Sequence, residues 1–229
     1  MDFYYKNEFE VGARAIVRAG KRLLDFYKTD LSIEYKDDES PVTKADLASE
    51  AIILDELGEF DYPILSEESR GDLSRLEADL VWIVDPLDGT KDFIHHTGDF
   101  SVMIGLACKG ESVLGLVYKP LEDKLYFAEK GKGAYCRDGE GRESRIKVSE
   151  VKKVEEIRLL VSRFHLLEVE KALVRDLGIH KTVESGSAGL KICKVAEGSA
   201  ELYLNTSDKT AEWDICAADV ILNEAGGRI

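Results

Sequence analysis

Apolar residues recur every three or four positions in two segments near the start of the chain, which predicts two helices. Residues 9–27 place their apolar side chains at the spacing of one helix face. Residues 42–57 show the same period, and Thr43 with Asp46 forms a pair typical of a helix N-terminus. We therefore expect two amphipathic helices, with Asp46 in the first turn of the second.

Short apolar runs follow these helices and predict strands. Residues 62–65 and 80–84 are two such runs, and acidic residues come directly after each. Residues 100–107, 112–118 and 124–129 are β-rich and are separated by turns that contain glycine or proline. The last three runs predict an antiparallel meander.

The last third of the chain has a different organisation. Residues 137–156 are charged and contain few large apolar side chains, so we place a join between two subdomains near them. The predicted division is an N-terminal α+β subdomain, residues 1–150, and a C-terminal α/β subdomain, residues 151–229. The second subdomain is expected to contain a strand at residues 157–162, helices at residues 166–177 and 189–196, and a last helix that includes Ile215 and Leu222 and stops at Gly226.

Composition and charge narrow the class of protein. Hydrophobic residues make up 44% of the 229 residues, enough for the core of an enzyme-sized globular protein. A net charge of -14 argues against a nucleic acid polymer as partner. No apolar run approaches the ~18 residues of a membrane helix, and residues 1–30 lack a cleavable signal. The four cysteines lack metal-site spacing and are expected to be reduced, mostly buried thiols, which fits a cytoplasmic protein: Cys108, Cys136, Cys193 and Cys216.

Four acids stand at the boundaries of predicted elements that are far apart in the sequence. Glu67 follows one strand, whereas Asp85 and Asp88 lie in a turn after the next. Asp214 lies at the start of the last helix. Active sites of open α/β folds are assembled at such positions. If these acids converge, two carboxylates about 4 Å apart repel by ~4 kcal/mol at an effective dielectric near 20, so the cluster protonates, splays or binds hard cations such as Mg²⁺, Mn²⁺ or Ca²⁺.

The DPLDG turn concentrates these candidates. Pro86 fixes φ and Gly89 tolerates conformations that a side chain forbids. Asp85 and Asp88 can then point to one side, with the Leu87 carbonyl exposed between them. One turn thus offers three possible metal ligands.

The residues directly after the turn suggest a site for an anion. The amides of Gly89, Thr90 and Lys91 come at a possible helix start, where backbone N–H groups bind phosphate well. Metal ligands beside such an amide cradle indicate phosphoryl chemistry.

Three motifs together resemble a known family. DPLDGTKDF, with SEES upstream and EWDICAADVILNEAGG downstream, is similar to the inositol monophosphatase superfamily of Mg²⁺-dependent, lithium-sensitive phosphatases. The resemblance extends from about residue 10 to the last residue, beyond which relatives continue into a further strand. It implies an α+β fold, the layered αβαβα sandwich of the inositol monophosphatase/fructose bisphosphatase type, and often a homodimer.

The resemblance also implies a set of metal ligands. Glu67, Asp85 and the Leu87 carbonyl are expected to hold one Mg²⁺. Asp85, Asp88 and Asp214 are expected to hold a second, and Mn²⁺ is a possible substitute.

Two further residues receive roles from the same resemblance. Asp46 is expected to pair with Thr90 and orient or deprotonate the attacking water, and with Glu67 to help position a third ion. The positive charge of three divalent ions then exceeds the five negative charges of the acids by one. This net positive charge suits a phosphate dianion. The implied mechanism is in-line attack by metal-activated water.

The form GTKDF points to a substrate. It resembles the branch that removes the 3′-phosphate from 3′-phosphoadenosine 5′-phosphate, whereas inositol-type relatives usually have asparagine at the position of Asp92. Residues matching His165, Ser187 and Lys191 line the nucleoside and second-phosphate side in such nucleotidases. Lys191, in a glycine-rich loop that leads into a helix, would supply the cation that a second phosphate requires. Gly89, Thr90 and Lys91 would hold the phosphate to be removed.

Other interpretations remain open for the sequence alone. Inositol 1-phosphate or fructose 1,6-bisphosphate is the alternative substrate for the same chemistry. A non-catalytic regulator that binds metal as part of its structure is the alternative of another class. Taken singly, Asp214 is more often a helix cap, and a surface lysine or packed histidine is nearly as probable at Lys191 and His165.

Overall fold

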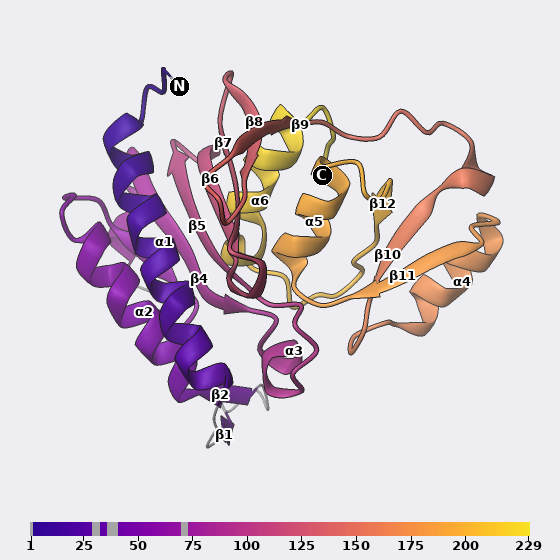
Figure 1. The fold of residues 1–229 in the computed structure, drawn as a ribbon, viewed down its shortest axis with the longest axis horizontal. Helices are drawn as coiled ribbons and strands as arrows, with labels where there is room; N and C mark the ends of the chain where they lie inside the picture. The colour runs from indigo at the N-terminus through magenta and orange to yellow at the C-terminus, as the bar shows by residue number, and fades with distance from the viewer. Residues whose placement is uncertain (1, 29–32, 36–40, 70–72) are drawn as a thin grey trace.

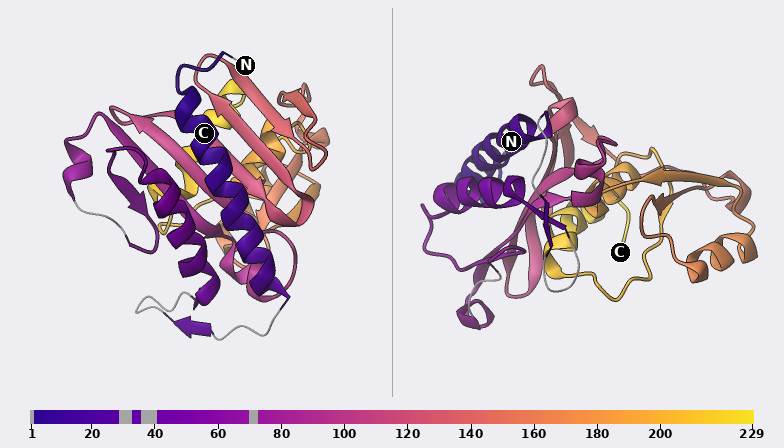
Figure 2. Two further views of the ribbon diagram at one scale, coloured as in Figure 1. Left: turned by 60° about the vertical axis from the view of Figure 1, so that its left-hand side comes forward. Right: turned by 90° about the horizontal axis from the view of Figure 1, so that it is seen from below.

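Helices and sheets alternate in five layers, as the computed structural model shows (Figure 1). Residues 2–28, 33–35, 41–69 and 73–229 are described. Helices α1 (Lys6–Tyr27) and α2 (Lys44–Leu57) cover one face of a large sheet, and α5 (Ala188–Ala196) and α6 (Glu212–Glu224) cover the other. A smaller sheet and α4 (Glu168–Asp176) form the last two layers (Figure 2). This αβαβα order confirms the predicted fold class.

The large sheet has seven strands in the order β3-β4-β5-β6-β7-β8-β9. Its strands are β3 (Ile64–Ser66), β4 (Leu80–Asp88), β5 (Ser101–Cys108), β6 (Glu111–Lys119), β7 (Lys124–Glu129), β8 (Gly133–Arg137) and β9 (Glu143–Ile146). Strands β3 and β4 are parallel, and every later pair is antiparallel. The predicted meander is therefore confirmed, and it continues into β8 and β9, which the hydrophobic pattern did not predict.

The smaller sheet has three parallel strands in the order β11-β10-β12. They are β10 (Arg158–Ser162), β11 (Lys181–Ser185) and β12 (Leu202–Tyr203). The remaining elements are β1 (Ile33–Tyr35), β2 (Pro41–Thr43), α3 (Thr90–Ile94) and three short 3₁₀ turns, η1 (Leu73–Leu76), η2 (Pro120–Glu122) and η3 (Val154–Glu156). The division into subdomains at residue 150 stays a prediction.

Two glycines allow α6 to lie directly on the large sheet. Gly105 of β5 and Gly115 of β6 are opposite each other in the strand pairing. A Cβ at Gly115 would overlap the carbonyl oxygen of Ala217, and one at Gly105 would lie 2.6 Å from Sγ of Cys216. Helix α6 thus approaches the sheet backbone closely, and this contact places the start of the helix near the end of β4.

Asp85 and Asp88 were expected in a turn after the strand, but β4 continues through Asp88, with an irregular register between these two residues against β5. The turn-forming residues bend a strand that stays paired, because Asp88 still lies opposite Ser101. The Thr43 N-cap falls on a side chain outside the described ones, although Asp46 does lie in the first turn of α2.

Candidate active site

Carboxylates from three separate parts of the chain gather at the end of β4. Asp85 is only 1% exposed, and Oδ1 of Asp85 accepts a hydrogen bond from the Leu87 N–H at 3.0 Å. Burial, followed by the charges of Glu67, Asp88 and Asp214, raises the pKa of Asp85 well above its usual value. The acids that the sequence analysis singled out are therefore close enough to act on one another.

Helix α6 delivers Asp214 to this group. Asp214 is the third residue of α6, and Oδ2 of Asp214 accepts a hydrogen bond from the Ala211 N–H at 2.6 Å. Burial raises the pKa of Asp214 to about 6, the Ala211 N–H opposes this rise, and the charge of Asp88 adds to it. The Asp214 side chain therefore caps the N-terminus of α6 and is also close enough to Asp88 to interact with it.

Helix α2 supports the bent end of β4 from the other side. The buried Ser49 hydroxyl donates to the Pro86 carbonyl at 2.7 Å, and Asp46, one turn earlier in α2, is also buried. The Thr90 hydroxyl donates to the Leu87 carbonyl at 3.2 Å. The expected pairing of Thr90 with Asp46 and the metal contact of the Leu87 carbonyl stay predictions.

Asp88 is held by the start of α5, which lies 99 or more residues later in the chain. The Ser187 hydroxyl and the N–H groups of Ala188 and Gly189 donate to its carboxylate, the two amides at 3.0 and 2.8 Å. The Ser101 hydroxyl is 3.4 Å away. Ser187, expected on the substrate side, thus contacts one of the predicted metal ligands.

Two lysines, Lys91 of α3 and Lys191 of α5, lie near His165. Burial, followed by the charges of Lys91 and Lys191, lowers the pKa of His165. Lys191 is only 3% exposed, with Nζ 3.4 Å from the Ser185 carbonyl and 4.9 Å from the centre of the Tyr203 ring. Its burial lowers its pKa. The structure therefore brings together three of the residues that were expected to face the substrate.

Gly89 connects Asp88 of the acidic cluster to α3, which contains Lys91. It precedes α3 with φ of +90°, and a Cβ there would lie 2.8 Å from the Asp99 carbonyl oxygen. Both the backbone conformation and the space therefore require glycine. The expected helix start at residues 89–91 is confirmed, while its role as a phosphate site stays a prediction.

The donor atoms of the acidic cluster fit a hard divalent cation such as Mg²⁺, because they are carboxylate oxygens and those of Asp85 and Asp88 are buried. In the ranges that the structure describes, no three His, Cys, Asp or Glu side chains form a set arranged to hold a metal ion. Oxygens of Asp85, Asp88 and Asp214 accept hydrogen bonds from protein N–H groups instead. An ion bound at these oxygens would compete with some of these donors.

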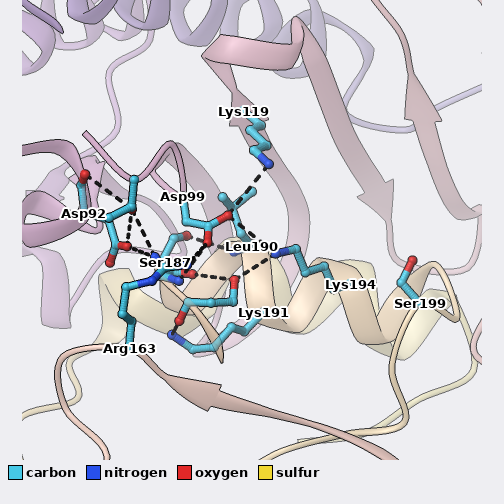
Figure 3. A network of polar contacts seen from close by, with 12 residues as sticks. Asp92, Asp99, Lys119, Arg163, Ser187, Leu190, Lys191, Lys194 and Ser199 are labelled. Carbon is cyan, nitrogen blue, oxygen red and sulfur yellow. Dashed lines mark hydrogen bonds and ion pairs between the residues drawn. The ribbon is translucent and has the colours of Figure 1, made fainter. Parts of the chain in front are cut away.

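The sequence analysis missed three charged residues beside the cluster. Arg163 contacts the carboxylates of both Asp92 and Asp99 (Figure 3). Asp92 and Arg163 each lie in a segment that the resemblance highlighted, so a signal for them existed. Asp99 has no local signature, since a single aspartate in a loop is ordinary.

Comparison with known proteins identifies the family. The sequence profile of the inositol monophosphatase family matches residues 6–229. The chain belongs to this family. It is accordingly a phosphatase, a hydrolase that acts on phosphomonoesters, as members of the inositol monophosphatase family are.

Individual relatives carry two different names. The 3′(2′),5′-bisphosphate nucleotidase CysQ of Salmonella typhimurium is 37% identical over 216 residues, which cover 92% of this chain and 85% of the relative. The inositol-1-monophosphatase of Bacillus subtilis is 32% identical over 228 residues, covering 95% and 83%. Among solved structures, CysQ from Bacteroides thetaiotaomicron superposes with a TM-score of 0.84 at 33% identity, covering 98% of this chain and 89% of that one.

Cys108, Cys136, Cys193 and Cys216 are all free thiols, and all but Cys108 are buried. Within the described part of the chain, no helix combines the length and the apolar character needed to cross a membrane.

Proposed function

We propose that the protein is a Mg²⁺-dependent phosphatase that removes the 3′-phosphate of 3′-phosphoadenosine 5′-phosphate. Metal dependence is supported by one observation: the charges of Glu67, Asp88 and Asp214 raise the pKa of the buried Asp85. A buried group of like charges is unstable without counter-ions. Two or three divalent ions would relieve this repulsion.

The proposed ligands divide into two sets. Glu67, Asp85 and the Leu87 carbonyl would hold one ion, and Asp85, Asp88 and Asp214 a second. When bound, Mg²⁺ supplies positive charge that favours an activated water and stabilises the leaving oxygen.

The remaining residues of the site orient water and phosphate. Asp46 is buried in the first turn of α2, and we assign it, with Thr90, the task of orienting or deprotonating the attacking water. The N-terminus of α3 at Gly89, Thr90 and Lys91 would hold the phosphate oxygens. A general acid is not required from a histidine, because the second ion would stabilise the leaving oxygen.

The region of His165 and Lys191 supports a substrate with a second phosphate. The charge of Lys191 helps to lower the pKa of His165, and Lys191 itself is buried with a lowered pKa. A buried ammonium group gains most from an anionic partner. The name of the Salmonella relative agrees with such a substrate, whereas the name of the Bacillus relative favours inositol 1-phosphate, which is the second candidate. Fructose 1,6-bisphosphate is the third.

Steady-state kinetics with the three substrates test this assignment. We expect the highest kcat/KM for 3′-phosphoadenosine 5′-phosphate. Lys191→Met should lower kcat/KM about 10-fold for this substrate but much less for 3′-AMP, which lacks the 5′-phosphate. Lys171→Met, on the exposed side of α4, serves as the control. A clear preference of the wild type for inositol 1-phosphate would refute the nucleotidase assignment.

Membership of the family also motivates proposals about setting and regulation. We propose a cytoplasmic enzyme, which the four free thiols support. Inhibition by lithium and assembly as a homodimer are proposed from the resemblance, and sedimentation of the purified chain tests the latter.

A further inference from the structure

The segment of Gly186 and Ser187, between β11 and α5, is surrounded by a network of ion pairs (Figure 3). Arg163 directly follows β10, and Nη2 of Arg163 donates to Oδ2 of Asp99 at 2.8 Å. Nη1 of the same guanidinium donates to Oδ1 of Asp92, in α3, and to the Thr97 hydroxyl at 3.0 Å. Arg163 thus joins the end of β10 to α3 and to Thr97 and Asp99, which lie between α3 and β5.

Asp99 is the shared acceptor of this network. Oδ1 of Asp99 lies 3.5 Å from Nζ of Lys194 and 3.8 Å from Nζ of Lys119, and Oδ2 also accepts the Gly186 N–H at 3.3 Å. Burial works to raise the pKa of Asp99, but the Arg163 hydrogen bond and the neighbouring lysines lower it overall. Asp99 is therefore a stable anion that holds the Gly186 backbone.

Gly186 is fixed on its other side by Asp92. A Cβ on Gly186 would overlap the Asp92 carboxylate, so the backbone lies directly against it. Because Arg163 binds both Asp92 and Asp99, one guanidinium sets the position of both walls around Gly186.

Ser187, the next residue, has an unusual backbone conformation. Its φ of 56° and ψ of 125° lie in a region that glycine prefers, and such a conformation costs about 1–3 kcal/mol unless its surroundings fix it. The strained backbone directs the Ser187 hydroxyl to the Asp88 carboxylate, beside the N–H groups of Ala188 and Gly189. The network around Gly186 therefore ends on Asp88.

We propose that Arg163 is a positioning residue: by holding Asp92 and Asp99 around Gly186, it fixes Ser187 and the start of α5, which in turn orient the Asp88 carboxylate. The inference rests on the proposed function, because it treats Asp88 as a metal ligand. It goes further because it gives Arg163 a role for two parts of the site. Arg163 supports the predicted metal ligand Asp88, and it lies two residues before His165, which is expected to contact the nucleoside. Partners that orient a metal ligand typically contribute 10–100-fold to metal affinity or activity.

The test compares variants at the two ends of β10. Arg163→Ala should weaken Mn²⁺ binding, measured by isothermal titration calorimetry, about 10-fold, and should lower kcat by about 10–100-fold on whichever phosphomonoester the wild type hydrolyses. The Mn²⁺ affinity and kcat of Arg163→Lys should lie between those of the wild type and of Arg163→Ala. The ammonium group keeps the charge but cannot bridge two carboxylates in the planar manner of a guanidinium. Arg158→Ala, which removes the ion pair with Glu201 at the start of the strand, should lower Tm without changing Mn²⁺ affinity or kcat.

Each outcome bears on the inference. Wild-type Mn²⁺ affinity in a folded Arg163→Ala variant would overturn it, even if Tm falls. If that variant does not fold, the Mn²⁺ affinity of Arg163→Lys decides, and a value equal to the wild type overturns the inference. A wild-type chain that binds no Mn²⁺ would instead refute the proposed function, and the inference with it.

Discussion

Asp85 combines burial with the charges of three neighbouring acids, Glu67, Asp88 and Asp214, which raise its pKa well above the usual value. The Leu87 N–H donates a hydrogen bond to Oδ1 of Asp85. Most buried carboxylates in folded proteins are paired with cations or with several donors. A position that combines burial with like charges is typical of a functional site rather than of a stabilising one.

The substitution Asp85→Asn separates these two effects. In the presence of a chelator, the variant should be more stable than the wild type by about 1 kcal/mol, because one member of the repelling group is neutral. Hydrolysis should nevertheless be lost, since an amide is a poor ligand for two divalent ions. Thermal unfolding in EDTA and an assay of released phosphate measure both quantities.

The exposed Asp61→Asn is the matched control and should change neither quantity. Retained hydrolysis in Asp85→Asn would show that the proposed ligand roles are wrong. A lower Tm in EDTA would show that Asp85 stabilises the metal-free fold.

The acids could be predicted from the sequence because each lies beside a recognisable local signal, such as a proline, a glycine or the start of a helix. Asp85 and Asp88 flank a proline and precede a glycine, and Asp214 stands in the first turn of a clearly periodic helix. The bond between Asp88 and Ser187 could not be predicted, because it joins residues 99 positions apart and depends on how α5 packs. Asp99 is similar, since its importance comes only from the cations that gather around it in space.

At the scale of elements, β10 links the two sides of the site. At its start, the Arg158 N–H donates to Oε2 of Glu201 at 2.6 Å, and the Arg158 guanidinium donates to the Gly198 carbonyl at 2.8 Å. At its end, Arg163 reaches Asp92 and Asp99. The strand is thus held by an arginine at each end, one remote from the site and one within it.

The pair at the start of β10 predicts a pH-dependent stability. The hydrogen bond from Arg158, followed by the opposing effect of burial, lowers the pKa of Glu201 to about 2 from 4.5. A carboxyl whose pKa is lowered by folding stabilises the folded state above the unfolded value, and this contribution disappears as the pH falls from about 4.5 to about 2. Glu201→Gln should therefore reduce the free energy of unfolding by about 1–2 kcal/mol at pH 7, and by much less at pH 3.

Urea unfolding at the two pH values measures this difference. The control is Glu150→Gln, which removes an exposed ion pair with Lys147 and should have little effect at either pH. An equal loss at pH 7 and pH 3 in Glu201→Gln would indicate a packing defect rather than a lost charge interaction.

Elements with a regular hydrophobic period could be predicted, and those without one could not. The helices α1, α2 and α6 and the strands β5 to β7 correspond to clear patterns. Strand β11 was missed because Lys181, Thr182, Val183 and Glu184 are all exposed, so the strand buries no face that would leave an alternating pattern. Helix α3 was expected only as a helix start at residues 89–91, because five residues are too few for a hydrophobic period to appear.

At the scale of the whole molecule, the site lies where the layers meet. Strand β4 belongs to the large sheet, α2 to the layer on one face, and α5 and α6 to the layer on the other (Figure 1). The acids reach the cluster from the ends of β3 and β4 and from the start of α6. Asp85 and Asp88 belong to the large sheet and Glu67 directly follows its strand β3, whereas Asp214 belongs to α6, so cations bound among these acids would connect the two layers.

Binding of Mg²⁺ should accordingly stabilise the whole fold. A ligand that binds only the folded state adds about 2.7 kcal/mol to the free energy of unfolding at 100 times its Kd. For a chain of this size, each kcal/mol shifts Tm by about 2–4 °C, so saturating Mg²⁺ should raise Tm by roughly 5–10 °C. NaCl at the same ionic strength should not reproduce the shift, because it only screens exposed charges. Calorimetry across millimolar Mg²⁺ tests this: an unchanged melting curve would contradict a clustered metal site, and a shift that Asp85→Asn abolishes would place the bound ions between the layers.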